Sequence, residues 1–264
     1  MTTDQRRIVV VGAGSGIGAA TARFFHERGD YVLGVDVRPR HDAASDWIQC
    51  DLREPLEIKA LLAQLSSGWD VLAHVAGVPG TLPAPDVFKI NYLGMRLMID
   101  GMIPLMRRGG SVVVVASTAA VGWEQNTAEL SGLLEATDTA SVDRWQADRD
   151  PTMAYYTSKQ AVVSYVKRAC GSAWSTYGVR VNSVSPGPVE TPILVDFESH
   201  MGKEMLDGVR DTIGRHGTVD DIVPVIAFLG SAEAQWVNGQ DIQVDGGFTV
   251  SLFNQPPIPV SANG

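Results

Sequence analysis

Short runs of apolar residues recur along the chain and alternate with longer stretches whose apolar positions repeat every three or four residues. Most of the short runs are continuously apolar, which is typical of parallel strands that are covered on both faces. The longer stretches have the period of amphipathic helices. The pattern predicts strands at residues 7–11, 31–36, 47–50, 71–75, 111–116, 179–184 and 241–244. It predicts helices at residues 17–28, 56–65, 91–107, 153–177 and 220–229.

This alternation of strand and helix predicts a doubly wound α/β fold, the Rossmann arrangement. We expect a single domain over residues 1–264, with a mostly parallel seven-stranded sheet and helices on both faces. Two segments, residues 123–152 and 193–217, interrupt the alternation. Both follow the carboxyl end of a predicted strand, where open α/β sheets bind ligands, so we expect substrate-side insertions. For residues 123–152, partly helical at 130–147, a role in capping the fold or an interface is equally open.

The composition limits the kinds of partner. A net charge of −9 argues against a general nucleic-acid or membrane surface. No apolar run approaches the ~20 residues of a membrane span, and the first residues lack the apolar core of a signal peptide. The cysteines, Cys50 and Cys170, are too few for a disulfide framework and indicate buried thiols in a reducing compartment. We therefore expect a cytoplasmic protein.

A glycine-rich turn follows the first predicted strand. Gly12, Gly16 and Gly18 stand where the strand passes into a helix, and glycine there permits a tight turn and a close approach of the backbone to a pyrophosphate. Asp36 ends the second strand, where a carboxylate accepts hydrogen bonds from both ribose hydroxyls and repels a 2′-phosphate. This favours NAD, although Arg38 two residues later is able to pair with such a phosphate. An ordinary strand-end turn is the alternative explanation for Asp36.

A tyrosine and a lysine supply the candidate chemistry. Tyr155 and Lys159 stand four residues apart in a predicted helix, which places phenol and ammonium on one face. A cation beside a phenol lowers a pKa that is ordinarily about 10. Such a pair suits proton transfer in a reaction between a nicotinamide and an alcohol or carbonyl. The pair also occurs by chance in helices, so its weight comes from the surrounding motifs. Asp51, after the third strand, either approaches an adenine amino group or belongs to an ordinary turn.

Taken together, these motifs resemble the classical short-chain dehydrogenase/reductase family along nearly the whole chain, closest to its bacterial 3-alpha-hydroxysteroid dehydrogenase/carbonyl reductase branch. The branch resemblance rests on GIGAAT, VDVR, PGPVETPIL, GQDIQVDGG and the long insertion before AYYTSK. Val11 and His74-Val75 depart from the family, which often has threonine and asparagine there; we expect local repacking rather than loss of activity. The family resemblance rests on Gly12, Gly16, Gly18, Asp36, Asp51, Leu52, Ala76, Gly77, Asn91, Ser117, Tyr155, Lys159, Pro186, Gly187, Thr191, Asp245, Gly246 and Gly247.

The resemblance implies a role for each catalytic position. Tyr155 is the base in alcohol oxidation and the acid in carbonyl reduction, and Lys159 lowers its pKa and binds the nicotinamide ribose. Ser117 hydrogen-bonds the substrate oxygen, and Asn91 holds a water that links Lys159 to solvent. Taken alone, Ser117 is a strand-end hydroxyl and Asn91 a helix N-cap. The implied NAD-binding residues are Gly12, Ser15, Gly16, Ile17, Gly18, Asp36, Arg38, Asp51, Leu52, Ala76, Gly77, Tyr155, Lys159, Pro186, Gly187, Val189 and Thr191.

Apolar side chains after the fifth and sixth strands predict a pocket for a bulky substrate of low polarity. Ordinary helix packing explains the same residues equally well. The expected substrate contacts are Ser117, Trp123, Tyr155, Pro188, Leu194, Phe197, Met201, Met205 and Leu206.

We expect an NAD(H)-dependent oxidoreductase that interconverts a secondary alcohol and a ketone on a hydrophobic, cyclic compound such as a steroid or terpenoid. The alternatives are a catalytically silent nucleotide-sensing protein, and a reductase of carbon–carbon double bonds or acyl-carrier thioesters. We expect no metal ion, no nucleic acid and no membrane partner. Family members usually form oligomers, so we expect a homo-oligomer, either a dimer or a tetramer.

Overall fold

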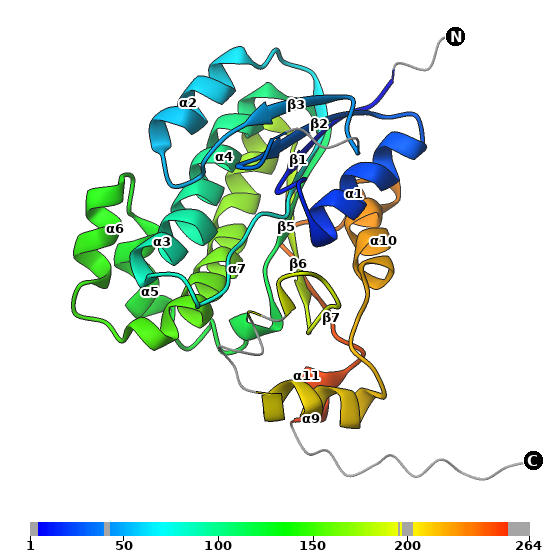
Figure 1. Cartoon of the computed structure of the whole chain (residues 1–264). Helices are drawn as coiled ribbons and strands as arrows, with labels where there is room; N and C mark the ends of the chain where they lie inside the picture. Colours follow the sequence, from blue (N-terminus) through cyan, green and yellow to red (C-terminus); the bar gives the residue numbers. More distant parts are fainter. Residues whose placement is uncertain (1–4, 40–42, 195, 197–202, 253–264) are drawn as a thin grey trace, which may run out of the picture.

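The computed structural model describes residues 5–39, 43–194, 196 and 203–252. At its centre lies a seven-stranded sheet in the order β3-β2-β1-β4-β5-β6-β7 (Figure 1). Among the described residues, every pairing of neighbouring strands is parallel. The strands are β1 Arg7–Val11, β2 Tyr31–Asp36, β3 Asp46–Gln49, β4 Trp69–His74, β5 Met106–Val115, β6 Arg180–Pro186 and β7 Asp241–Val244.

The sheet reverses its direction of growth at β1. Val11 of this strand pairs with Val35 of β2 on one side and with His74 of β4 on the other. In doubly wound sheets, ligands bind outside the carboxyl ends of the strands at this reversal. The fold therefore places the candidate site beyond Val11, as the sequence predicts.

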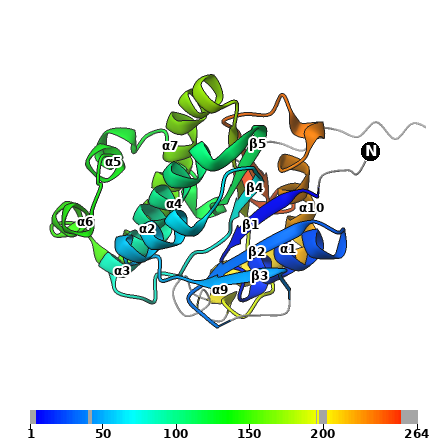
Figure 2. The same cartoon turned by 90° about the horizontal axis from the view of Figure 1, so that it is seen from above.

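Helices cover both faces of the sheet. Figure 2 shows α1 and α10 on one face and α2, α4 and α7 on the other. The described helices are α1 Gly16–Glu27, α2 Pro55–Gln64, α3 Ala84–Phe88, α4 Met95–Met102, α5 Thr127–Leu134, α6 Thr139–Gln146, α7 Ala154–Ser172, α9 Lys203–Ile213, α10 Val219–Leu229 and α11 Phe248–Ser251, with π-helical turns η1 Lys89–Gly94 and η5 Ala173–Tyr177. In the part of the chain that the structure describes, no helix is both long enough and apolar enough to cross a bilayer.

Each face of the sheet has its own hydrophobic core. Ile8 and Phe25 belong to the core under α1 and α10, and Leu72 and Val162 to the larger core on the other face. Fully burying such a side chain contributes about 1.5–3 kcal/mol, so the continuous apolar strands explain the layered fold. Both cysteines are free; Cys50 is buried as expected, whereas Cys170 is partly exposed.

The helix predicted at residues 91–107 begins earlier and ends earlier than expected. Helical backbone starts at Ala84, continues through η1 and α4, and gives way to β5 at Met106. Pro85 at the start of α3 has the fixed φ that favours a first helical turn. Asn91 lies inside η1, so its interpretation as a helix N-cap is wrong. The π-turn explains the error, since its extra residue breaks the helical period of apolar positions.

The insertion before α7 contains two helices rather than one helical stretch. Asp138 separates them, and its Oδ1 accepts a hydrogen bond of 2.7 Å from the Ser141 backbone nitrogen, which starts α6. Figure 1 shows α5 and α6 outside α3 and α7, on the side away from the sheet. Arg96 of α4 anchors the end of α5, because its Nη1 donates to the carbonyl oxygens of Leu134 and Ala136 at 2.7 Å each.

Candidate active site

A cavity of about 680 Å³ opens at the carboxyl edge of the sheet, at the reversal between β1 and β4. Its walls come from the loops after β1, β2, β3, β4, β5 and β6 and from α7, α9 and α11. Every residue of the implied NAD-binding set lines it, and so does Ser117. The fold thus brings together residues that lie far apart along the chain.

The glycine turn forms a cradle in which side chains do not fit. A Cβ atom on Gly12 would lie 2.6 Å from the Ala76 backbone nitrogen, and one on Gly18 would lie 1.9 Å from the Gly12 carbonyl oxygen. Gly12 also has a φ of +86°, which disfavours other residues. The helix α1 begins at Gly16 without a side-chain cap from Ser15, so its first N–H groups remain available to an anion. This cradle fits the pyrophosphate of a dinucleotide.

Two backbone N–H groups hold Asp36 at the cavity wall. Its Oδ2 accepts from the Gly14 nitrogen and its Oδ1 from the Arg38 nitrogen, both at 2.9 Å. The carboxylate keeps acceptor capacity on both oxygens, which suits the two hydroxyls of a ribose. The Arg38 side chain is exposed at the rim of the same cavity.

Asp51 is paired with a neighbour that the sequence interpretation did not single out. Arg53 Nη2 lies 2.5 Å from Asp51 Oδ2, and hydrogen bonds from Arg53 hold the pKa of this carboxyl below its usual range. Both residues line the end of the cavity near Asp36. Asp51 therefore stays ionised as a hydrogen-bond acceptor.

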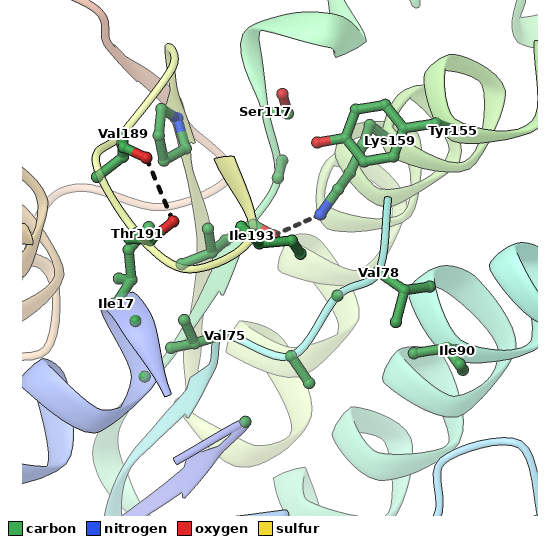
Figure 3. A pocket seen from close by; sticks show the side chains of 18 of the residues that line it. Ile17, Val75, Val78, Ile90, Ser117, Tyr155, Lys159, Val189, Thr191 and Ile193 are labelled. Atoms are coloured by element: carbon green, nitrogen blue, oxygen red, sulfur yellow. Dashed lines mark hydrogen bonds between the residues drawn. The ribbon is translucent and has the colours of Figure 1, made fainter. Parts of the chain in front are cut away.

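Ser117, Tyr155 and Lys159 meet at the other end of the cavity. Figure 3 shows the phenol, the hydroxyl and the amine directed into the same space. Tyr155 and Lys159 are 4% and 5% exposed, and Lys159 Nζ lies 5.9 Å from the Tyr155 ring centroid. Ser117 and Tyr155 both line the cavity, so a substrate oxygen placed between them would meet both hydroxyls.

The direction of the Tyr155 pKa differs from the sequence expectation. Burial raises the pKa of Tyr155 to about 12, while the nearby Ser117 hydroxyl acts in the opposite direction. Lys159 lies over the ring, and its Nζ donates to the Val115 carbonyl oxygen at 3.3 Å. Burial also lowers the pKa of Lys159 to about 8. Desolvation thus outweighs the attraction between a cation and a phenolate that the spacing of four residues predicts.

Asn91 lies behind these residues and outside the cavity lining. Its Oδ1 accepts from the Val78 nitrogen at 2.8 Å, and its Nδ2 donates to the Val78 carbonyl oxygen at 3.0 Å and to Ser158 Oγ at 3.1 Å. Ser158 Oγ in turn donates to the Tyr155 carbonyl oxygen at 2.7 Å. The amide therefore ties the loop after β4 to α7. Its role in holding a water for Lys159 stays a prediction.

The two departures from the family pattern have different consequences. Val11 needs no side-chain hydrogen bond, because its carbonyl oxygen accepts from the backbone nitrogens of Val75 and Ala76 at 2.8 and 2.9 Å. His74 is buried, and neither ring nitrogen has a hydrogen-bond partner among the described residues. Burial, followed by the positive charge of Lys159, lowers the pKa of His74 to about 3.

The loop after β6 closes the cavity over the glycine turn. The Gly187 nitrogen donates to the Val244 carbonyl oxygen at 3.1 Å, which ties the loop to β7. Thr191 Oγ1 donates to the Val189 carbonyl oxygen at 3.2 Å. A Cβ atom on Gly16 would lie 3.4 Å from Thr191, so this loop reaches the start of α1.

The expected substrate contacts divide into three groups. Pro188, Leu194 and Leu206 line the cavity. Trp123 does not; it packs against the larger core, with Lys167 Nζ 5.9 Å from its ring centroid. Phe197, Met201 and the Met205 side chain lie outside the described residues, although Met205 belongs to α9.

No residue of 123–152, a segment described throughout, lines the cavity. Leu130 and Leu133 of α5 and Val142 of α6 are instead fully buried in the larger hydrophobic core. Of the two roles that the sequence left open for this insertion, the structure favours capping.

Several lining residues were not identified from the sequence, and most of them come from segments without a recognisable motif. The four-residue helix α11 contributes two of them, Phe248 and Thr249, and the residue after it, Leu252, a third; an apolar period is not detectable over so short a helix. Within the described ranges, no three histidine, cysteine or acidic side chains gather as metal ligands would. The lining residues that were not identified include Val78, Leu82, Ile90, Thr118, Val121, Tyr156, Ile193, Phe248, Thr249 and Leu252.

Comparisons with known proteins agree with this arrangement. A family model described as "Enoyl-(Acyl carrier protein) reductase" matches residues 12–132 and 138–249. A coniferyl-alcohol dehydrogenase from Pseudomonas sp. (strain HR199 / DSM 7063) is 33% identical, over 94% of this chain and 98% of the relative. A 3-alpha-hydroxysteroid dehydrogenase/carbonyl reductase from Comamonas testosteroni is 31% identical, over 91% of this chain and 95% of the relative.

A solved structure shares the fold. The 3-alpha-hydroxysteroid dehydrogenase from Pseudomonas sp. B-0831, complexed with NADH, superimposes with a TM-score of 0.79 and 27% identity. The match covers 95% of this chain and 100% of that chain. The likeness therefore extends over the sheet, the glycine turn and the α7 helix together.

Proposed function

The chain belongs to the short-chain dehydrogenase/reductase family, and we propose that it is an NAD-linked enzyme that interconverts a secondary alcohol and a ketone on a hydrophobic ring compound. The observation that carries the proposal is the meeting of Ser117, Tyr155 and Lys159 in one cavity with the glycine cradle. A general acid–base group, a second hydrogen-bond donor and a dinucleotide site are what this reaction requires.

Ser117, Tyr155 and Lys159 have different roles at the substrate oxygen. NAD⁺ bound in the cradle supplies the acceptor for the hydride. In alcohol oxidation Tyr155 accepts the hydroxyl proton, and in ketone reduction it donates one. Ser117 Oγ accepts from the Ala119 nitrogen at 3.1 Å, so its own O–H is available to donate to the substrate oxygen. Because the pKa of Tyr155 is raised to about 12, the proton-donating phenol predominates at neutral pH.

Lys159 contributes as the cation beside the phenol. Its Nζ donates to the Val115 carbonyl oxygen, and Lys159 lines the cavity that would hold the nicotinamide ribose. A positive charge here stabilises the phenolate that forms when Tyr155 releases its proton. Because the pKa of Lys159 is lowered to about 8, this charge is lost as the pH rises above that value.

Asp36 supports a preference for NAD over NADP. The carboxylate stands at the end of β2 with both oxygens fixed by backbone N–H groups, so a 2′-phosphate placed there would meet a second negative charge. Arg38 is exposed and offers a weaker, solvent-screened attraction to that phosphate.

The substrate end of the cavity supports a neutral, apolar substrate. Apart from Lys159, the described residues that line this end carry no charged side chain, and Val121, Leu194 and Leu206 are among its walls. Relatives named for coniferyl alcohol and for a 3-alpha-hydroxysteroid act on ring-bearing alcohols, which agrees with these walls. Shape and hydrophobicity would then select the substrate rather than charge.

The description of the matching family model favours a second candidate, reduction of a carbon–carbon double bond in an acyl-carrier substrate. Ser117 beside Tyr155 argues against it, because two hydroxyls on one oxygen suit a C–O bond. A net charge of −9 also disfavours docking of an acidic carrier protein.

The remaining features of the proposal are a single domain, a cytoplasmic location and a homo-oligomeric state. The cores on both faces of one continuous sheet support a single domain. The low cysteine content supports a cytoplasmic location. The third is argued below from the exposed surface.

The test is reduction of NAD⁺ and NADP⁺ by the purified protein with ring alcohols and with propan-2-ol. We expect NAD-linked turnover of a ring alcohol. Tyr155→Phe should lower kcat about 10²–10⁴-fold, the contribution typical of a general acid–base group. NADH binding, followed by fluorescence titration, should be retained and should change far less than kcat in this variant.

Tyr177→Phe is the matched control, since it removes an exposed phenol that does not line the cavity and leaves Tyr155 in place. NADH binding without turnover of any alcohol or ketone would reject the enzyme in favour of the nucleotide-sensing alternative. Turnover of an enoyl thioester alone would establish the second candidate.

A further inference from the structure

We propose that the carboxy-terminal helix α11 is a second wall of the substrate site, and that Phe248 and Leu252 determine the size of the ring that the enzyme accepts. This inference rests on the proposed function and adds a specificity determinant to it. Sequence patterns direct attention to the loop after β6, whereas the cavity is also bounded by this short helix.

The helix presents one face to the cavity. Phe248 and Leu252 stand four residues apart and both line it, together with the buried Thr249. Val250 of the same helix does not line the cavity and is 61% exposed. The helix therefore has a cavity side and a solvent side, and the cavity side carries large apolar groups.

The position of α11 in the fold assigns it to the substrate end. Asp36 and Arg53 mark the adenosine end, over β2 and β3 at one edge of the sheet. The helix α11 follows β7 at the opposite edge, beyond β5 and β6, whose loops carry Ser117 and Pro188. A group attached to the reacting carbon would extend toward this edge.

The start of α11 is fixed by its own turn. Asp245 Oδ1 accepts from the Gly247 nitrogen at 2.9 Å, and its Oδ2 accepts from the Thr249 nitrogen at 2.8 Å. A Cβ atom on Gly187 would lie 3.0 Å from Asp245 Cβ, so this turn packs directly against the loop after β6. Phe248 is thereby held at a defined distance from the catalytic end.

The helix α9 supplies the facing wall and supports α11. A Cβ atom on Gly246 would lie 2.6 Å from Ile213 Cγ2, so the turn before α11 packs on the end of α9. Leu206 of α9 and Leu194 line the cavity between them. Leu252 is 65% exposed, and a ring placed against it would remove this apolar surface from water.

The experiment compares Phe248→Ala and Leu252→Ala with Val250→Ala, a matched control on the solvent side. Each protein is assayed with NAD⁺ and either 2-decalol, a two-ring alcohol, or propan-2-ol. We expect kcat/KM for 2-decalol to fall about tenfold in the first two variants, the lower end of the effect of pocket methylene groups on specificity. Turnover of propan-2-ol and NADH affinity should stay within twofold, and Val250→Ala should match the unmodified protein.

An equal loss of kcat/KM with both alcohols in Phe248→Ala and Leu252→Ala, or weaker NADH binding, would overturn the proposal, because it would place α11 against the cofactor. No change with either alcohol would overturn it as well. If the unmodified protein oxidised neither alcohol, the proposed function would fail, and calorimetric titration of 2-decalone into the NADH complexes would test the wall separately. Weaker binding in Leu252→Ala than in Val250→Ala supports the wall, whereas equal or absent binding in all proteins rejects it.

Discussion

His74 is a titratable residue enclosed on all sides. It is 1% exposed, and among the described residues nothing hydrogen-bonds either ring nitrogen. Protonation would add a buried positive charge near Lys159, which is why the pKa falls to about 3 from an ordinary 6.5. Keeping this imidazole neutral lowers the free energy of unfolding once the pH falls below the ordinary pKa of histidine.

We expect His74 to make the fold sensitive to acid. Its folded pKa lies below its unfolded pKa, so the unfolded chain binds an additional proton between the two values. The contribution of the neutral His74 to the free energy of unfolding is fully present above about pH 6.5. It is lost as the pH falls, by up to about 1.4 kcal/mol per pH unit. Urea unfolding between pH 7 and 4.5 measures this slope.

The comparison needs variants that do not titrate. His74→Leu removes the imidazole, and His74→Asn keeps a polar group of the kind that the family often has nearby. Both should lose less stability than the unmodified protein over the same pH range. Parallel curves for all three proteins would show that His74 is not the source of the acid sensitivity.

For individual residues, the sequence predicts which side chains lie together better than it predicts their pKa values. Tyr155 and Lys159 share one helix face as the spacing requires, yet burial reverses the expected direction of the tyrosine pKa. Burial depends on the whole surrounding fold and leaves no local signal. For the same reason Trp123, an aromatic residue near a predicted pocket, packs into the core instead.

At the scale of elements, the strands were predictable and the short or irregular helices were not. Continuous apolar runs locate all seven strands to within a few residues, except that β5 begins at Met106 and not at residue 111. The π-turn η1 and the four-residue α11 have no period long enough to detect. The helix predicted at residues 220–229 starts within one residue of α10, and the Thr218 nitrogen before it donates to Asp221 Oδ2 at 2.7 Å.

The insertion gives an element-scale prediction, because one side chain secures it. Arg96→Met keeps the aliphatic stem but removes the donor to the carbonyl oxygens of Leu134 and Ala136. We expect the free energy of unfolding to fall by about 2 kcal/mol, as is typical for hydrogen bonds to a charged group. Hydrogen exchange should accelerate in α5, while kcat should not change because this segment does not line the cavity.

Arg168→Met is the matched control, since this arginine holds the same segment only through an exposed ion pair with Glu135. Such pairs contribute about 0–1 kcal/mol, so the control should be nearly neutral. An equal loss of stability in both variants, or a fall in kcat with Arg96→Met, would contradict the assignment of α5 and α6 as a cap.

At the scale of the whole molecule, the helices α5 and α6 determine which surface is available for contact between subunits. Because α5 and α6 cover α3 and α7, an oligomer that packs those helices together is obstructed. Elsewhere, Phe228 of α10 is 43% exposed, and Trp236, in the segment before β7, is 91% exposed. Among the described residues, β7 is the last strand of the sheet. Exposed aromatic side chains beside an unpaired strand edge are typical of a subunit interface.

We therefore expect a homo-oligomer that associates through α10 and the β7 edge. Trp236→Lys should shift the protein toward the mass of one chain at micromolar concentration, measured by sizing chromatography with light scattering. Leu56→Lys, a change at an exposed apolar position on α2, should leave the mass unaltered. A monomeric unmodified protein, or an equal shift in both variants, would refute this interface.

The cavity is built from residues that span almost the entire described chain, from Val11 to Leu252. Since a ribosome makes the polypeptide from its amino end, the glycine cradle and the strands around it emerge well before α11. A nascent chain that has folded only its first half already holds the phosphate-binding turn but lacks the wall beside the reacting carbon. Competence for turnover is therefore among the last properties that the protein acquires during its synthesis.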